Sequence, residues 1–437
     1  MHIEKICLIL IGDNKMKFLT NAEKLKSTRK YLKLKQEDLV DENLTRGLIS
    51  MIEIGKREIS NKVALKLVEK FEQRAKELDI ELKIDNGFLL RSPSEDAELF
   101  CLRKLKEINQ DKDIKEILEI ADKFNLLNIK AIGYSKLGDY YSNEINYDEA
   151  FINYNNALDI FKNIKQNETI PNIYLKIGYC KAKSLQYKEA LSFFYISQRY
   201  SIIYNDKKIE KRATYDIAKC YMKLNKINLA LENIEKFLSL CNKEEDYNGY
   251  IYANILKANC YEANKEFNTA IDIYDSLLIE DIDCNNPVLG YIYNNLGLAY
   301  LNKDDFNNSL EYFDKAEQLR IKIDSANLCH TIIEKSSVYI KQGFYKEAIT
   351  FIESGLKQAE ANMDYEYLIK GNYELVSIYE ILNDNSSLKK TYLNIADFLK
   401  ILNKCSELVS VYIKLSIIYL NENNIQDAKK YLLMSQK

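Results

Sequence analysis

The sequence predicts an all-α protein in which a small helical bundle is followed by a long array of helical pairs, an α-solenoid. Three observations support this fold class. The 437 residues include only 3 Pro and 13 Gly, so long uninterrupted helices are allowed nearly everywhere. A pattern of small residues and tyrosines recurs about every 40 residues through roughly three-quarters of the chain. Between Thr20 and Phe71 the pattern differs, with short apolar segments separated by polar turns.

The repeat is clearest between Tyr291 and Ala316, where the pattern predicts a helix, a short polar turn and a second helix. Most copies have a small residue at the position of Gly297 and a tyrosine three positions later. Nine residues after the tyrosine, the start of each second helix has Ala or Ser, except for Leu388 in one copy. Successive copies are 39 or 40 residues apart, at Gly138, Gly178, Ala218, Ala258, Gly297, Ser336, Val376 and Ser416. This regular period predicts a solenoid in which each pair buries one face on the next.

The spacing of Leu296, Gly297 and Tyr300, followed by Ser309 and Phe313, resembles the tetratricopeptide repeat. A 40-residue step exceeds the usual length of about 34 and overlaps the step of HEAT and armadillo arrays. The tyrosine-to-alanine register favours the tetratricopeptide interpretation, and longer helices would absorb the extra residues. The resemblance implies a right-handed tetratricopeptide-like solenoid, which we expect at residues 96–437 with about nine helical pairs.

Residues 1–15 are expected to be an extension in front of the folded domains. The apolar segment Ile6–Ile11 is too short to span a bilayer, and no small-residue cleavage site follows it, so we do not interpret it as a targeting signal. Met16 begins a lysine-rich segment that leads directly into the first predicted helix. We hypothesise that translation starts at Met16 and that the extension is not native.

Residues 16–75 are predicted to form a bundle of short helices. The segments LKQEDL and RGLISMIEIGKR resemble the two helices of the Cro/C1-type helix-turn-helix domain, also called the XRE family. Either segment alone would be a weak signal, but the two together are specific. The expected helices begin after Thr20 or Asn21, cover Lys35–Val40 and Arg46–Glu53, and begin again after Ser60 or Asn61.

The helix-turn-helix resemblance implies DNA-binding roles for several side chains of this bundle. Arg46 is the strongest candidate for reading a base, because a guanidinium can donate two hydrogen bonds to guanine. Gly47 departs from the longer polar residue often found there. Arg29 and Glu53 match a pair that forms an internal salt bridge in related domains. Phosphate contacts are implied for Gln36, Lys56 and Arg57, and base contacts for Thr45, Arg46, Ser50 and Met51. The alternative is that the bundle only caps the solenoid.

Residues 76–95 are expected to form a helical linker and a domain boundary, which Asn86-Gly87 and the segment Arg91–Ser94 mark. The net charge of the whole chain, −3, indicates little about partners. Residues 15–60 nevertheless contain eleven Lys and Arg against seven Asp and Glu. A modest basic region on an acidic body suits contact with phosphates at one end only.

The concave face of the solenoid is expected to be polar and to bind peptide. Asparagine amides can pair with both the N–H and the C=O of an extended backbone, and tyrosines add flat area at little entropic cost. In the tetratricopeptide register the inward positions hold Asn172, Arg212, Tyr215, Asp216, Lys219, Tyr252, Asn259, Tyr291, Asn294, Asn295, His330, Glu334, Lys370, Tyr373 and Glu374. Asn259, Asn294 and Asn295 should lie near one another on the concave wall, and Asn259 and Asn295 are expected to lie outside the core between repeats. The alternative is that each asparagine is solvated or structural, since Asn is abundant throughout the chain.

An XRE-type domain followed by a long tetratricopeptide array resembles the RRNPP group, the pheromone-responsive regulators of Gram-positive bacteria (Rap, Rgg, NprR, PlcR and PrgX types). The resemblance covers Thr20–Lys437. It implies a cytosolic homodimer whose solenoid binds a short signalling peptide and thereby changes how two domains bind double-stranded DNA, as in quorum sensing. Two alternatives stay open: a regulator that holds a protein partner, and a DNA-binding repressor whose array only dimerises.

We expect no enzyme, no cofactor, no metal site and no membrane partner. The sequence has no phosphate-binding glycine loop and no Ser/His/Asp set. Nine cysteines without a C-x-x-C pair give neither a disulfide framework nor a zinc site. Cys180, Cys220 and Cys260 occupy one repeat position and are expected to be buried core residues of a cytoplasmic protein. His330 has no second ligand of the right type at helical spacing.

Overall fold

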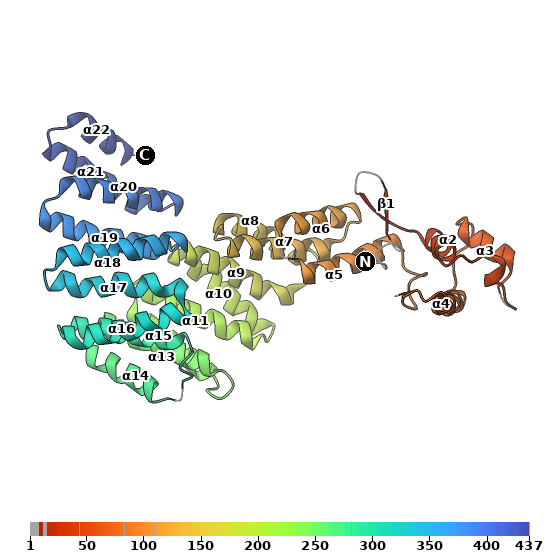
Figure 1. Ribbon diagram of the computed structural model, residues 1–437, viewed down its shortest axis with the longest axis horizontal. Helices are drawn as coiled ribbons and strands as arrows, with labels where there is room; N and C mark the ends of the chain where they lie inside the picture. Colours follow the sequence, from red (N-terminus) through yellow and green to blue (C-terminus); the bar gives the residue numbers. More distant parts are fainter. Residues whose placement is uncertain are drawn as a thin grey trace. The chain divides into compact units, whose positions relative to one another are not determined.

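The computed structural model describes residues 8–11, 15–42, 44–82, 84–108, 110–280 and 282–436, with side chains described from residue 17 onward. Most of these residues are helical, so the predicted all-α class is confirmed (Figure 1). The chain divides into two compact units, Met1–Thr169 and Ile170–Lys437. None of the described helices combines the length and the apolar character needed to cross a membrane.

The first described residues form a small antiparallel sheet of β1 (Leu8–Ile11) and β2 (Lys15–Phe18), which the sequence analysis did not predict. Phe18 is buried, and its ring meets Phe100 and Phe124 edge to face, with ring centroids 5.7 and 5.4 Å apart. Such aromatic pairs add to the apolar burial and fix the end of β2. The start of translation at Met16 stays a prediction. Residues 1–7 and 12–14 of the predicted extension lie outside the described residues.

The next elements form the N-terminal bundle: α2 (Asn21–Tyr31), the 3-10 turn η1 (Glu37–Leu39), α3 (Arg46–Glu53) and α4 (Asn61–Glu77). They follow the predicted order, although the second helix is reduced to a single 3-10 turn. Thr20 caps α2: its side chain accepts from the backbone N–H of Glu23, and the Glu23 side chain accepts from the backbone of Thr20. The core of the bundle includes Leu25, Leu32, Leu39, Ile49, Leu67 and Phe71.

The helical linker predicted within residues 76–95 is wrong, because after α4 the described chain has no helix until the first repeat helix. Asp79 adopts a left-handed conformation, with φ of 51°, just after α4 ends. Ile80, Leu82 and Ile84 then pack against the core of the bundle. Apolar residues at every second position are typical of extended chain, so the sequence did contain the signal that this segment is not helical.

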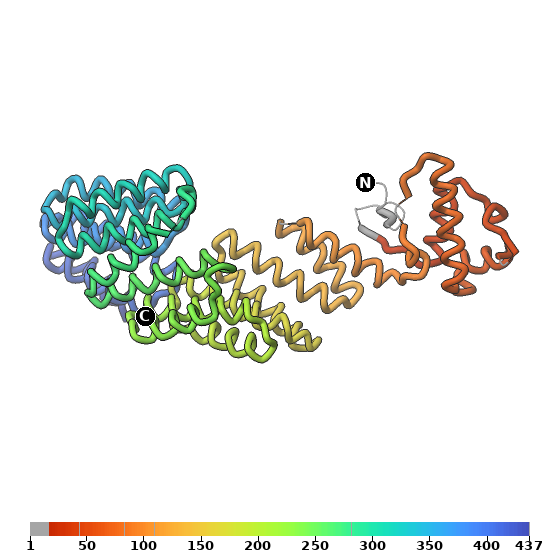
Figure 2. The backbone as a smooth tube through the Cα atoms, turned by 90° about the horizontal axis from the view of Figure 1, so that it is seen from below, coloured from red at the N-terminus to blue at the C-terminus, as the bar shows by residue number. Residues whose placement is uncertain are grey.

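The remaining described elements include eighteen helices, α5 to α22, which pack as consecutive pairs (Figures 1 and 2). The first unit contains α5 (Pro93–Glu107), α6 (Asp111–Lys123), α7 (Leu127–Asn143), α8 (Tyr147–Asn163) and the 3-10 turn η2 (Asn167–Thr169). The second unit contains α9 (Ile170–Lys183), α10 (Tyr187–Ile203), α11 (Lys207–Lys223), α12 (Ile227–Leu240), α13 (Tyr247–Ala263), α14 (Phe267–Ile279), α15 (Val288–Asn302), α16 (Phe306–Ile323), the 3-10 turn η3 (Ser325–Asn327), α17 (Leu328–Lys341), α18 (Tyr345–Ala361), α19 (Tyr365–Leu382), α20 (Asn385–Ile401), α21 (Cys405–Asn421) and α22 (Ile425–Met434).

Helix length explains the 40-residue step. Helices α7, α8, α10 and α11 have 17 residues each, and three-residue turns join α7 to α8 and α10 to α11. A residue with positive φ ends the preceding helix and lets its last carbonyls find partners. Such residues recur every 20 positions at Asn125, Ile145, Lys165, Leu185, Asn205 and Asn225. The step therefore exceeds the usual tetratricopeptide length because the helices are longer, as predicted.

Close contact between the two helices of a pair explains the small residues of the pattern. A Cβ atom at Gly297 of α15 would lie 2.9 Å from the ring of Phe313 on α16, which is too close for ordinary packing. The Ser309 hydroxyl donates to the carbonyl of Gly297 at 2.7 Å, and both residues are buried. Cys180 and Cys260 are buried thiols, as predicted.

Candidate functional site

The helix predicted to read DNA, α3, presents its first turns to solvent. Thr45 caps the helix, because its hydroxyl accepts from the N–H of Leu48 at 3.2 Å. The Arg46 guanidinium lies 3.1 Å from the carboxylate of Glu37 on η1, and both side chains are more than 60% exposed (68% and 62%). An exposed pair of this kind contributes little and leaves Arg46 available for another partner. Of the predicted interface, Thr45, Arg46, Met51, Lys56 and Arg57 are exposed, and Gln36 and Ser50 are half-buried.

Gln36 takes part in a network inside the bundle. Its Nε2 donates to Oε2 of Glu53 at 2.8 Å, and Arg29 donates to the same carboxylate through Nε at 2.6 Å and Nη2 at 2.9 Å. The predicted ion pair of Arg29 with Glu53 is therefore confirmed. Burial alone would raise the pKa of Glu53, but the hydrogen bonds from Arg29 and Gln36 hold that pKa below its usual value. The phosphate contact of Gln36 stays a prediction.

A second buried network joins the bundle to the first repeat helix within the first unit. Lys24 of α2 is fully buried and forms an ion pair with Asp96 of α5. Its Nζ also donates to the carbonyls of Phe88 at 3.0 Å and Arg91 at 2.6 Å. The Arg91 Nε donates to Oδ1 of Asp96 at 2.8 Å. The sequence analysis did not find this network, because its members are distant in the chain.

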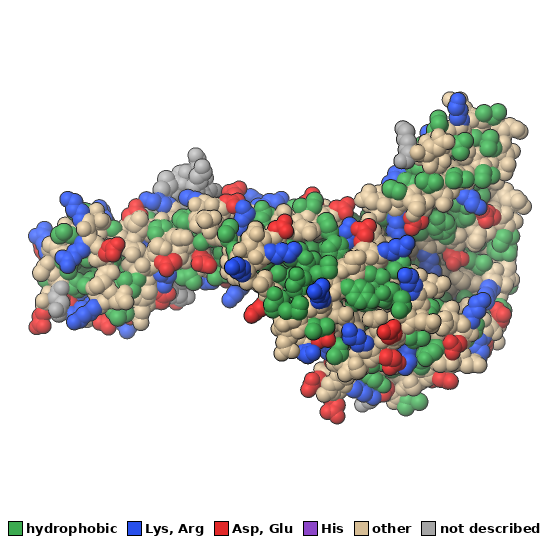
Figure 3. Space-filling view, turned by 180° about the vertical axis from the view of Figure 1, so that it is seen from behind, with side chains coloured by type: hydrophobic (Ala, Val, Ile, Leu, Met, Phe, Trp, Pro, Cys, Tyr) green, Lys and Arg blue, Asp and Glu red, His purple; other side chains and the backbone are tan. Residues whose placement is uncertain are grey.

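In the second unit, the helices α9, α11, α13, α15, α17 and α19 neighbour one another in succession. Lys223 at the end of α11 forms an ion pair with Glu366 at the start of α19, and the Tyr187 hydroxyl donates to Glu366 at 3.5 Å. Helices far apart in sequence therefore meet. The space-filling view shows a hollow in this unit with acidic and basic side chains around it (Figure 3). We use the name groove for the side of α11, α13, α17 and α19 that holds the interacting charged residues Arg212, Lys219, Glu262, Glu334, Glu366 and Lys370.

The three asparagines predicted to hold a peptide lie close together but already have partners. Asn295 Nδ2 donates to Oδ1 of Asn259 at 2.8 Å, and the hydroxyl of the buried Tyr274 donates to the same oxygen. Asn294 is buried and donates to Glu334. Asn294 is therefore part of the buried interior. Asn259, which was expected to lie outside the core, holds the hydroxyl of a buried tyrosine.

Glu334 of α17 is the centre of a buried network in the groove. Its Oε1 accepts from Lys370 Nζ at 2.7 Å and from the Tyr367 hydroxyl at 2.6 Å, while Asn294 donates to Oε2. Burial alone would raise the pKa of Glu334, but the charge of Lys370 and these hydrogen bonds hold it at about 2. The predicted ligand-binding side chains Lys370 and Asn294 are thus engaged by this carboxylate.

Other charged groups of the groove are less fully paired. Burial raises the pKa of Glu262 to about 7, the nearby Glu334 adds to the rise, and a hydrogen bond of 2.9 Å from Asn302 opposes it. The Lys219 side chain is exposed, yet the surrounding protein lowers its pKa against the opposing charge of Asp216. Glu262 on α13 and Lys219 on α11 can therefore gain from groups of opposite charge on a ligand.

Several predicted aromatic positions lie along the same helices. The rings of Tyr252 and Tyr291 meet edge to face with centroids 6.3 Å apart, and the Arg320 guanidinium lies 5.0 Å from the centroid of Tyr291. Tyr215 packs on Phe237 with ring centroids 5.4 Å apart. These side chains are half-buried or buried, so they shape the wall of the groove. The other predicted positions Asn172, Arg212 and Tyr373 are exposed.

Comparison with known proteins gives one family match. Residues 290–320 match the tetratricopeptide repeat family. No curated protein matches the chain. Similar solved structures include the apo form of the quorum sensor NprR from B. thuringiensis, which is 19% identical, with 78% of this chain and 98% of that chain covered and a TM-score of 0.47. NprR in complex with its cognate peptide NprX is also 19% identical, with coverages of 78% and 97% and a TM-score of 0.49. A Rap protein complexed with Competence and Sporulation Factor is 13% identical, with coverages of 78% and 98% and a TM-score of 0.46.

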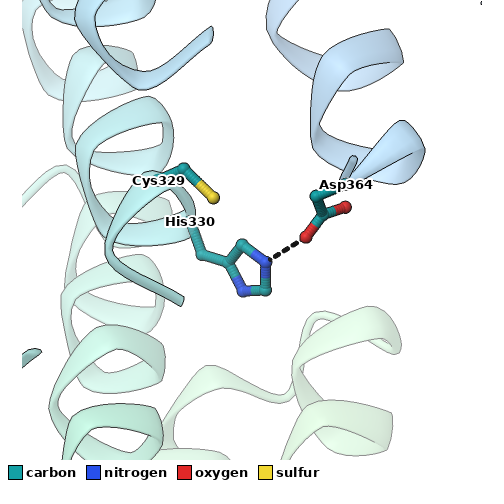
Figure 4. Close-up of side chains that lie close together, drawn as sticks. All are labelled: Cys329, His330 and Asp364. Carbon is teal, nitrogen blue, oxygen red and sulfur yellow. Dashed lines mark hydrogen bonds and ion pairs between the residues drawn. The ribbon is translucent and has the colours of Figure 1, made fainter. Parts of the chain in front are cut away.

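The tetratricopeptide register gave His330 but not its partner Asp364. His330 Nε2 lies 2.7 Å from Oδ2 of Asp364, and its ring stacks on Tyr367 with centroids 3.7 Å apart (Figure 4). Asp364 precedes α19, whereas a ligand at helical spacing from His330 would lie on α17. Lys223 and Glu366 were missed for the same reason. The only available signal was the cluster of acidic and aromatic residues around the start of α19.

Proposed function

We propose that this protein is a DNA-binding transcriptional regulator whose repeat helices bind a short signalling peptide and thereby modulate DNA binding. The observation that carries the proposal is the groove of the second unit. It combines charged, amide and tyrosine side chains, and the Lys223–Glu366 ion pair joins α11 to α19 beside them. A polar hollow of this kind favours a small polar ligand over an apolar one.

The chemistry of the groove favours a peptide. Desolvation by the surrounding protein raises the pKa of Glu262 and lowers the pKa of Lys219, which favours the neutral form of both. Each therefore gains when a ligand group of opposite charge approaches. A peptide carries charges of both signs and a backbone with donors and acceptors. The exposed amide of Asn172 and the exposed ring of Tyr373 offer further contacts on α9 and α19.

The N-terminal bundle supports the DNA-binding part of the proposal. The exposed Arg46 lies in the first turn of α3, where a side chain can enter the major groove. Gly55 ends α3 with φ of 71°, and the exposed Lys56 and Arg57 follow it. Cations at this position suit contacts with the phosphate backbone. Because domains of this type usually bind two half-sites, the proposal includes a homodimer in the cytoplasm.

Selection from random double-stranded DNA by the purified full chain tests the DNA-binding part. We expect an enriched motif whose affinity falls steeply with salt. Arg46→Ala should lower affinity for that motif by about 1–3 kcal/mol, because a contact with a base is lost. Lys112→Ala, at an exposed position of α6, is the matched control and should leave affinity unchanged. No enrichment, or an unchanged affinity after Arg46→Ala, would contradict this part.

Mass spectrometry of small peptides that co-purify with the full chain tests the peptide part. A recovered peptide, synthesised and added back, should raise the melting temperature and change the DNA affinity of the protein. A peptide that stabilises the protein without changing DNA affinity would favour the regulator that holds a protein partner. DNA binding with no peptide response would favour the repressor whose repeats only dimerise.

A further inference from the structure

Three side chains with metal-binding atoms come together between α17 and α19 (Figure 4). Cys329 and His330 lie in the first turn of α17, and Asp364 is the N-cap residue of α19. One ligand atom from each, the thiol sulfur, a ring nitrogen and a carboxylate oxygen, lies within 4.8 Å of the other two. Across the part of the chain that the structure describes, no other group of three His, Cys, Asp or Glu side chains meets this description.

Two of the three side chains are already held in position. Asp364 Oδ1 accepts from the backbone N–H of Tyr367 at 3.1 Å, which leaves Oδ2 facing His330 Nε2 at 2.7 Å. The imidazole stacks on the Tyr367 ring with an interplanar angle of 9°. A carboxylate and an imidazole fixed in this way need little rearrangement to share one ion, since neighbouring contacts that orient the ligands are what strong metal sites have in common.

The third side chain, Cys329, is fully buried and has only a weak partner. Its thiol donates to the carbonyl of Ala326 at 3.8 Å, a long contact. The buried thiol carries the proton that it donates in this contact. A bound metal ion would take the place of that proton, and metal binding would release it to solvent.

We propose that Cys329, His330 and Asp364 bind a divalent transition-metal ion, with Zn²⁺ as the preferred ion. One sulfur, one nitrogen and one oxygen ligand suit Zn²⁺ and leave a fourth position for water, whereas Mg²⁺ and Ca²⁺ require oxygen ligands. The thiolate and the carboxylate together neutralise the charge of the ion. The side chains of His330 and Asp364 are 17% and 24% exposed, which provides a path of entry.

The charges around the site restrict which ions it can hold. Arg320 acts on Cys329 and Lys183 acts on Asp364, and both are cations. Their repulsion opposes weakly bound cations, so only an ion that forms strong bonds to sulfur and nitrogen should be retained. Binding would replace the hydrogen bond between His330 and Asp364 with two bonds to the metal and would tie α17 to α19. The inference does not depend on peptide or DNA binding.

Titration of the full chain with Co²⁺ tests the site, because Co²⁺ reports thiolate ligation by charge-transfer absorption and tetrahedral geometry by visible bands. Cys7, Cys284 and Cys405 are first changed to Ser, which removes two exposed thiols and the one outside the described residues. We expect one equivalent of Co²⁺ to bind, with both signals, and Zn²⁺ to displace it. Cys329→Ala should abolish the charge-transfer band, whereas Cys260→Ala, which removes another buried thiol, should preserve it.

Asp364→Asn is a second variant, chosen because Asn also caps helices and should preserve α19. We expect it to weaken Co²⁺ binding by at least about tenfold. Even the loss of a residue that only supports a metal ligand typically lowers the metal affinity by that factor. Circular dichroism without metal shows whether each variant is folded. If the parent protein gives no charge-transfer band, or if the band persists in Cys329→Ala, the proposal is overturned. If Cys329→Ala does not fold, an unchanged Co²⁺ affinity of Asp364→Asn overturns the proposal instead.

Discussion

The N-terminal bundle and the groove differ in how they accommodate buried charge. In the bundle, the Glu53 carboxylate accepts hydrogen bonds from Arg29 and Gln36, and Lys24 forms an ion pair with Asp96. In the groove, Glu334 is paired with Lys370. Glu262 has no such close cationic partner among the described residues, and burial raises the pKa of Glu262 to about 7. Matched buried charges favour one arrangement of side chains, whereas incompletely matched ones can respond to an added charge. The comparison shows that buried charges have more complete partners in the bundle than in the groove.

Breaking the Lys24–Asp96 ion pair should have the largest effect. Lys24→Ala leaves the buried Asp96 with Arg91 as its remaining cationic partner and takes the donor away from two backbone carbonyls. It should lower the free energy of unfolding by about 3–5 kcal/mol. Urea unfolding of the full chain, followed by circular dichroism, measures it. Lys17→Ala breaks the exposed pair of Lys17 with Glu23 and should cost no more than about 1 kcal/mol. Equal losses in the two variants would remove the contrast between buried and exposed pairs.

Glu334→Gln should have the next largest effect, because it removes a matched charge from the groove. A pKa lowered to about 2 means that ionised Glu334 stabilises the folded state above its unfolded pKa, and that this stability is lost as pH falls toward 2. At pH 7 the variant should lose about 2–3 kcal/mol of unfolding free energy, and the loss should shrink in acid. A loss that stays constant from pH 7 to pH 3 would contradict the assigned network.

Glu262→Gln should act in the opposite direction. A raised pKa means that stability from the neutral carboxyl is fully present below its unfolded pKa and is lost as pH rises through about 7. Glutamine stays neutral, so between pH 5 and pH 8 the variant should gain about 1–2 kcal/mol relative to the parent. Thermal unfolding at the two pH values measures this difference. If Glu262→Gln and Glu334→Gln respond alike to pH, the distinction between the two carboxyls is wrong.

Gly47→Ala should have the smallest effect and concerns the bundle alone. A Cβ at Gly47 would meet only the Thr45 hydroxyl, 4.0 Å away, so there is room for it. Alanine in place of glycine should stabilise α3 by about 0.5–1 kcal/mol, since it restricts the unfolded chain. Denaturant unfolding measures the gain. A destabilised variant would show that the start of α3 is packed more tightly than the contacts indicate.

Contacts between neighbours in the sequence were predictable, and contacts across the fold were not. The small residue at Gly297 and the aromatic at Phe313 belong to one helical pair, so the pattern revealed both. Arg29 with Glu53 followed from the resemblance of the bundle to helix-turn-helix domains. The ion pair of Lys223 with Glu366 depends on how far successive pairs curve. That curvature results from small rotations at each interface, which no single copy of the repeat encodes.

The three-residue turns between helices, each with one residue of positive φ, limit how such a chain can change in length. In α7, α8, α10 and α11, helices of 17 residues alternate with three-residue turns, so adding or deleting one complete pair keeps each later helix in phase with its turns. Adding one residue inside a helix instead rotates all later side chains of that helix by about 100° and moves its apolar stripe away from the neighbour. Gene duplication in units of one pair is therefore the change in length that this architecture tolerates best.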